Sequence, residues 1–147
     1  IKITFFFLSI FFVYHLYNFF SFTPYQYTYL NFLNGDNSNR YQKFENDYWG
    51  TSVQELITKS QFNTDKVIKL ATCGVVGGIP KEYFKKKSNL KHQFVPAEDA
   101  DYIVMINRVT KNGDEMINCF DKYKGKNIAA VKKRGLILSV IRKINIE

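Results

Sequence analysis

Residues 3–22 read ITFFFLSIFFVYHLYNFFSF, a stretch of twenty residues without a formal charge. As an α-helix this stretch would be roughly 30 Å long, which matches the hydrocarbon core of a bilayer. Phe, Leu, Ile and Val favour insertion at the centre of a membrane helix, and Lys2 can reach the interface from the end. The stretch therefore predicts a transmembrane helix over residues 1–23. It should end close to Pro24, because proline is disfavoured inside a helix.

A cleaved signal peptide is the alternative interpretation of this stretch. Its apolar core would be about 7–15 residues long and would lead to an A-x-A-like site. Here a longer run leads to Pro24 and a tyrosine-rich segment, so we favour the membrane helix. Because the chain begins with Ile1 rather than Met, we expect the C-terminal part of a longer protein. Within the span, His15 and Asn18 predict packing against neighbouring helices, since polar groups at that depth seek protein partners.

The rest of the chain divides into a juxtamembrane aromatic segment, 24–52, and a small domain, 53–147. Apolar, β-branched runs predict strands at 67–73, 93–95 and 101–107. Helices are expected at 53–59, 80–87 and 114–123, and the end of the chain reads as a hairpin that turns near Arg134 and Gly135. The predicted fold class is α/β: one N-terminal transmembrane helix, then a small α/β domain ending in a β-hairpin.

Two local patterns refine this division. Tyr25, Tyr27 and Tyr29 alternate, which fits either a strand or an aromatic belt at headgroup depth, and we favour the belt because the segment follows the span. Ser52 and Glu55 form a capping-box pattern before the helix predicted at 53–59.

The charge pattern limits the possible partners. The formal net charge is +8, with 17 Lys against 4 Arg. We discount nucleic acid, because the lysines are dispersed and their excess fits an A+T-rich codon bias. The densest group, Lys81 to Lys91, is most simply a solvated helix face. Its functional alternative is contact with anionic lipid headgroups.

Two cysteines, Cys73 and Cys119, form no metal-binding motif with the two histidines, His15 and His92. Their apolar surroundings favour buried free thiols. The alternative is a disulfide between them, which would form if the domain faces an oxidising compartment.

Two segments are candidate sites. Gly74 to Gly78 follows a strand and precedes a helix, as a phosphate loop would, but it matches no phosphate-loop motif and we favour a plain turn. Glu45 and Asp47 could bind a metal or act as acid and base. We favour a structural role in which they pair with Arg40 and Lys43 while Trp49 anchors at the interface. No nucleophile–base pair is visible, so no catalytic residue, cofactor or metal is predicted.

The motifs PYQYTYLN at 24–31 and FENDYWGTS at 44–52 resemble the C-terminal region of bacterial polytopic GT-C glycosyltransferases, similar to dolichyl-phosphate-mannose protein mannosyltransferases. ADYIV at 100–104 and GLILSV at 135–140 also resemble later parts of that region. The resemblance implies a polyprenyl-phosphate-linked sugar donor, an acceptor, and a domain outside the cytoplasm on the inner membrane. The family's expected catalytic acid lies in a region absent from this chain, so no catalytic residue carries over.

The resemblance thus suggests a non-catalytic C-terminal fragment, with the bilayer, the lipid-linked sugar and the acceptor as partners. Its motif residues are the candidates for substrate contact: Tyr25, Gln26, Asn31, Glu45, Asp47, Tyr48 and Trp49. The alternative hypothesis is a single-span, membrane-anchored interaction module without enzymatic activity.

Overall fold

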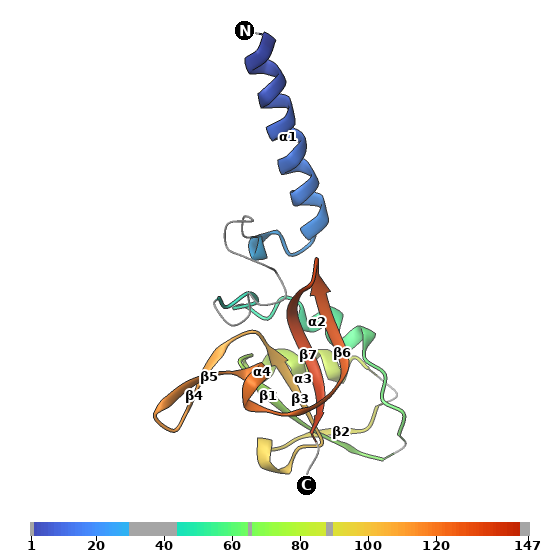
Figure 1. The fold of residues 1–147 in the computed structure, drawn as a ribbon. Coiled ribbons are helices and arrows are strands. Elements are labelled where there is room, and N and C mark those ends of the chain that lie inside the picture. Colours follow the sequence, from blue (N-terminus) through green and yellow to red (C-terminus); the bar gives the residue numbers. More distant parts are fainter. Residues whose placement is uncertain (1, 30–43, 65, 88–89, 145–147) are drawn as a thin grey trace.

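The computed structural model describes residues 2–29, 44–64, 66–87 and 90–144. A long N-terminal helix, α1 (Lys2–Phe22), stands apart from a mixed α/β domain that ends in a β-hairpin (Figure 1). The predicted fold class is thereby confirmed. The helical elements after α1 are η1 (Gln26–Thr28), α2 (Val53–Lys59), α3 (Gly78–Lys85), η4 (Ala97–Asp99) and α4 (Cys119–Lys122). The strands are β1 (Ile68–Cys73), β2 (His92–Phe94), β3 (Tyr102–Ile106), β4 (Val109–Asn112), β5 (Glu115–Asn118), β6 (Gly125–Lys133) and β7 (Leu136–Ile144).

The helix α1 carries apolar side chains around its whole circumference. Phe6, Phe11 and Phe20, for example, are 63%, 62% and 68% exposed. A helix that is apolar all round is stable when lipid or protein covers it, not when water does. Among the described residues, α1 is the one helix that is long and apolar enough to cross a membrane.

Five strands form one sheet in the order β2-β1-β3-β7-β6. Strand β1 runs parallel to both β2 and β3, and β7 is antiparallel to β3 and to β6. The parallel pairs need crossovers, which α3 and η4 supply, whereas β6 and β7 are joined directly. Strands β4 and β5 form a separate two-stranded hairpin.

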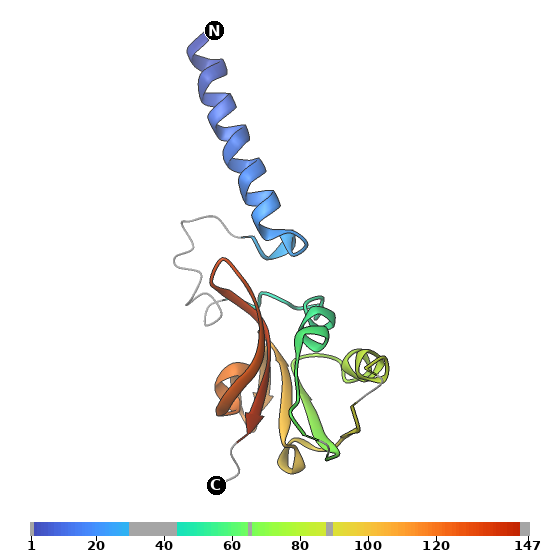
Figure 2. The same ribbon diagram turned by 90° about the vertical axis from the view of Figure 1, so that its right-hand side faces the viewer.

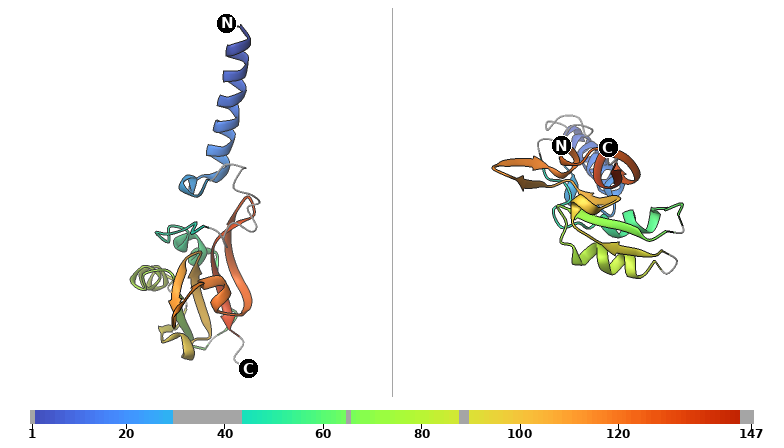
Figure 3. Two further views of the ribbon diagram at one scale, coloured as in Figure 1. Left: turned by 60° about the vertical axis from the view of Figure 1, so that its left-hand side comes forward. Right: turned by 90° about the horizontal axis from the view of Figure 1, so that it is seen from below.

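Helices α2 and α3 cover one face of the sheet and α4 lies on the other (Figures 2 and 3). An apolar cluster packs on each face. Because strand side chains alternate, Leu70 joins the cluster beneath α2 and α3, while its neighbour Ala71 joins the cluster beneath α4. Leu56 of α2 and Phe84 of α3 are fully buried in the first cluster. The main core thus lies between the sheet and the helices α2 and α3.

The structure corrects three local predictions. Residues 114–123 are divided equally between strand β5 and the short helix α4, because Gly113 at φ +64° forms a tight β4–β5 turn. Of the alternating tyrosines, Tyr27 lies in the 3-10 helix η1 and Tyr25 and Tyr29 flank it, so the strand alternative does not form and the aromatic belt stays a prediction. Helix α3 begins at Gly78, two residues before Pro80. The capping box does not form, since the Ser52 side chain makes no cap hydrogen bond to α2.

Cys73 and Cys119 form a disulfide, so the expectation of free thiols is wrong. The bond joins the end of β1 to the start of α4, and both cysteines are buried. Sequence left this pairing open, because it depends on whether the domain faces an oxidising compartment. A disulfide of this kind persists in an oxidising compartment.

Removing the disulfide should destabilise the domain substantially. The bond closes a loop of 46 residues, to which the chain-entropy model assigns about 4 kcal/mol. We expect the double substitution Cys73→Ala and Cys119→Ala to lower the free energy of unfolding by about 2–4 kcal/mol. Urea titration of the micelle-bound chain, followed by the fluorescence of Trp49, measures this. A reducing agent should destabilise the wild type but leave the double variant unchanged, and an insensitive wild type would contradict the pairing.

Candidate functional site

The DYWG sequence forms a tight turn that points two aromatic side chains outward. The Gly50 N–H donates to the Asp47 carbonyl at 2.9 Å, and Gly50 has φ +67°, a conformation that favours glycine. Tyr48 and Trp49 occupy the tip and are 47% and 73% exposed. The motif therefore separates a buried carboxylate from two exposed rings.

The Asp47 carboxylate, which is completely buried, organises this region. It accepts hydrogen bonds from the backbone N–H groups of Thr51 and Ser52 at 3.0 and 3.2 Å, next to the N-terminus of α2. It also accepts from the hydroxyls of both residues. The Ser52 hydroxyl is in turn hydrogen-bonded to that of Ser139 in β7, at 2.6 Å. Asp47 thus joins the turn, the start of α2 and the sheet. Its predicted partners, Arg40 and Lys43, lie outside the described residues.

Tyr27 connects the segment after α1 to this carboxylate. Its hydroxyl donates to Asp47 at 2.5 Å and is also hydrogen-bonded to the Thr51 hydroxyl. Its ring, half exposed, separates two hollows in the surface. We call them the tyrosine groove, between η1 and α2, and the aromatic recess, beside the DYWG turn.

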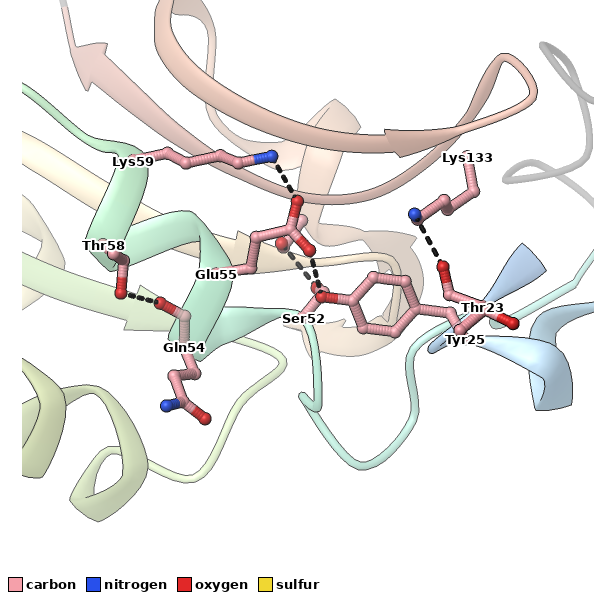
Figure 4. A network of polar contacts seen from close by, with 9 residues as sticks. Thr23, Tyr25, Ser52, Gln54, Glu55, Thr58, Lys59 and Lys133 are labelled. Carbon is pink, nitrogen blue, oxygen red and sulfur yellow. Dashed lines mark hydrogen bonds and ion pairs between the residues drawn. The ribbon is translucent and has the colours of Figure 1, made fainter. Parts of the chain in front are cut away.

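The tyrosine groove has a volume of about 560 Å³ and opens just after the end of α1. Tyr25 and Tyr27 form one wall. The other wall consists of Thr51, just before α2, and the polar face of α2, formed by Gln54, Glu55, Thr58 and Lys59. Figure 4 shows Gln54 and Thr58 beside the network that joins Lys59, Glu55 and Tyr25. A carboxylate, an amide, hydroxyls and aromatic rings therefore lie together close to the C-terminal end of α1.

Glu55 is the charged centre of the groove. It accepts hydrogen bonds from Lys59 at 2.5 Å and from the Tyr25 hydroxyl at 2.6 Å. These two bonds, that from Lys59 first, hold the pKa of Glu55 below its ordinary value. Burial and the bond to Glu55 raise the pKa of Tyr25, so the phenol stays protonated and donates to the carboxylate.

The aromatic recess is smaller, about 200 Å³, and is lined by Tyr27, Phe44, Glu45, Tyr48 and Trp49 among others. The Arg108 guanidinium lies 4.3 Å from the centre of the Tyr48 ring, a cation–π distance. Glu45 accepts a hydrogen bond from the Val109 N–H at 2.9 Å, so it faces β4 instead of Asp47. The two carboxylates have different partners, which does not suit a shared metal or an acid–base pair.

The other predicted site residues are distributed as follows. Gln26 donates to the Thr23 hydroxyl and lines a mostly apolar hollow along α1. Asn31 lies outside the described residues. Across the described parts of the chain, no group of three His, Cys, Asp or Glu side chains could hold a metal ion. Gly74 lies close to the side chains of Arg108, Ile106 and Cys119, whereas Gly78 is exposed. The segment from Gly74 to Gly78 is a turn that leads into α3.

The lysine group 81–91 is divided in the structure. Lys87 turns inward and donates to the carbonyls of Ile57 and Ser60 at the C-terminal end of α2, where the helix dipole favours a cation. Burial lowers its pKa. Lys81, Lys85 and Lys86 are exposed on or beside α3, which lies farther from α1 than α2 does (Figure 2). This face does not lie at the end of α1.

Sequence reasoning missed the α2 wall of the tyrosine groove. Thr51, Gln54, Glu55 and Thr58 recur at intervals of three and four residues, which places them on one helical face. The signal was present opposite the apolar face of Val53, Leu56 and Ile57, but only Glu55 was considered, as part of a capping box.

Removing the buried carboxylate should cost about 3 kcal/mol of stability, because Asp47→Ala leaves the N–H groups of Thr51 and Ser52, just before α2, without their acceptor. The matched control is Glu45→Ala, which removes one hydrogen bond from an exposed side chain and should cost under about 1 kcal/mol. Urea unfolding of both variants measures the difference. Equal losses would contradict the central role of Asp47.

The lowered pKa of Glu55 predicts an acid-sensitive contribution to stability. A carboxylate whose folded-state pKa is depressed stabilises the fold above its unfolded pKa, here 4.5, and loses that contribution as the pH falls through the folded value. We therefore expect Glu55→Gln to destabilise the chain at pH 7 and to flatten the loss of stability on acidification. Thermal unfolding between pH 7 and pH 3 measures this. Glu98→Gln, on the exposed η4, is the control and should keep the wild-type slope.

No protein-family model matches the chain, and neither the curated proteins nor the solved structures contain a match. The geometry of the tyrosine groove and the aromatic recess is therefore the basis for assigning a function, and the resemblance to GT-C glycosyltransferases stays a prediction.

Proposed function

We propose that this chain is the membrane anchor and extracytoplasmic domain of a glycosyltransferase that uses a polyprenyl-phosphate-linked sugar. In this proposal the domain binds sugar next to the membrane and supplies no catalytic group. The observation that carries the proposal is the position of the tyrosine groove: one of its walls, Pro24 to Tyr27, directly follows the helix that is long enough to span a bilayer. The sugar headgroup of a polyprenyl-phosphate donor at the membrane surface would therefore lie next to this groove.

The chemistry of the groove suits a sugar. Sugars offer many hydroxyls and a few apolar C–H faces, so their sites combine hydrogen-bonding side chains with aromatic rings. The groove provides the Gln54 amide, the hydroxyls of Thr51 and Thr58, and the ring of Tyr27. The aromatic recess adds Trp49 and Glu45 on the other side of Tyr27 and would accommodate a second sugar or the acceptor.

The disulfide supports the extracytoplasmic side. Structural disulfides persist in the periplasm or outside the cell and are rare in the cytosol. Since the domain carries one between Cys73 and Cys119, the proposal places it at the outer face of the inner membrane. The resemblance of the motifs at 24–31 and 44–52 to GT-C enzymes leads to the same side.

The test is sugar binding by the full chain in nanodiscs, probed with polyprenyl-phosphate-mannose and followed by NMR. Losing one neutral hydrogen bond costs about 0.5–1.5 kcal/mol, so Gln54→Ala should raise the Kd by about 2–10-fold. Gln93→Ala is the matched control, because Gln93 is exposed on β2 at the edge of the sheet. The chain alone should not transfer sugar.

Two results would refute the proposal. If Gln54→Ala and Gln93→Ala bind the probe equally well, the groove is not the sugar site. If the chain alone turns over the donor, the claim that it supplies no catalytic group fails.

A further inference from the structure

The turn between β6 and β7 lies next to the C-terminal end of α1 (Figure 3). Arg134 Nη1 donates to the Asn18 side-chain oxygen at 2.7 Å, and Lys133 Nζ donates to the Thr23 carbonyl at 2.8 Å. The Arg134 guanidinium also lies 5.3 Å from the centre of the Tyr17 ring. The hairpin therefore brings adjacent cationic side chains to the last turn of the helix.

The depth of these contacts decides what surrounds them. Asn18 lies four residues before the end of α1 at Phe22, about 6 Å along the axis at about 1.5 Å per residue. If α1 crosses a bilayer, its last turn lies where the acyl chains meet the headgroups. The Arg134 side chain then stands at the level of the lipid phosphates, over the rings of Tyr17 and Phe22.

The charges around the turn are mostly of one sign. Lys132, Lys133 and Arg134 are consecutive, and Lys132 and Arg134 are exposed. Three acidic side chains described near this end of the domain each have a partner: Glu55 is bonded to Lys59 and Tyr25, Asp47 is fully buried among its own donors, and Glu45 accepts from the Val109 N–H. The β6–β7 hairpin, residues 125–144, contains no acidic residue, so its turn is cationic.

We propose that the β6–β7 turn, residues 132–134, binds the phosphate groups of anionic phospholipids in the leaflet where α1 ends, and so holds the domain against the membrane. Guanidinium and ammonium groups pair well with phosphate oxygens, Arg in a bidentate way. This role belongs to the hairpin rather than to the lysines of α3, which lie farther from α1 (Figure 2). It requires α1 to span a membrane but does not depend on sugar binding.

The test uses the full chain in phosphatidylcholine nanodiscs that contain a minority of phosphatidylglycerol. A photoactivatable phosphatidylglycerol is cross-linked and the attachment site is mapped by peptide mass spectrometry. We expect cross-links at residues 132–134 that a matching phosphatidylcholine probe does not give. Each juxtamembrane cation contributes about fivefold to anionic lipid binding. Lys132→Gln should therefore reduce cross-linking about fivefold, and Lys132→Gln with Arg134→Gln should reduce it more than tenfold.

Two controls make the result specific. Lys81→Gln with Lys85→Gln removes the same charge from α3 and should leave the cross-links unchanged, and Arg134→Lys should retain most of them. Because Lys132 is exposed, Lys132→Gln tests the proposal even if a substitution at Arg134 disturbs docking to α1.

Three outcomes overturn the proposal. The first is equal cross-linking by the phosphatidylglycerol and phosphatidylcholine probes. The second is an equal loss in the α3 control. The third is cross-linking of the turn by a photoactivatable polyprenyl phosphate but not by phosphatidylglycerol, which would assign the turn to the sugar donor.

Discussion

The buried carboxylate of Asp47 is the constraint on which the site depends. A carboxylate removed from water is unfavourable unless donors surround it, and here two backbone N–H groups and three hydroxyls do so. The donors come from different parts of the chain: the loop before α2, the start of α2, and Tyr27 near α1. One anion therefore fixes the DYWG turn, the entry of α2 and the segment that leaves the helix.

The same constraint connects the helix to the domain. Tyr27 reaches Asp47, Tyr25 reaches Glu55, and the β6–β7 turn reaches back to Asn18 and Thr23. The contacts come from both α2 and the hairpin, so they restrict rotation of the domain about the end of α1 more than a single contact would. The surface that bears the tyrosine groove is consequently held towards that end of the helix.

Sequence predicted the elements with strong periodicity and missed those that depend on turn chemistry or distant partners. Helix α2 begins and ends where expected, and the β6–β7 hairpin turns at Arg134 and Gly135, both at positive φ as a type I′ turn requires. The β4–β5 hairpin was missed because Gly113 was not weighed against the apolar spacing of Met116 and Phe120. The DYWG residues were identified as a candidate site, but the network around Asp47 continues through Ser52 to Ser139, which lies 87 positions after Ser52 in the chain.

The construction of the groove couples ligand binding to the position of the domain. One wall, from Pro24 to Tyr27, belongs to the segment that follows α1, and the other belongs to α2. The groove exists only when the two are docked through Glu55 and Asp47. A ligand that contacts both walls binds the docked arrangement better than an undocked one, so it must stabilise docking by its differential affinity. Ligand binding in the groove and docking of the domain at the end of α1 are therefore thermodynamically linked.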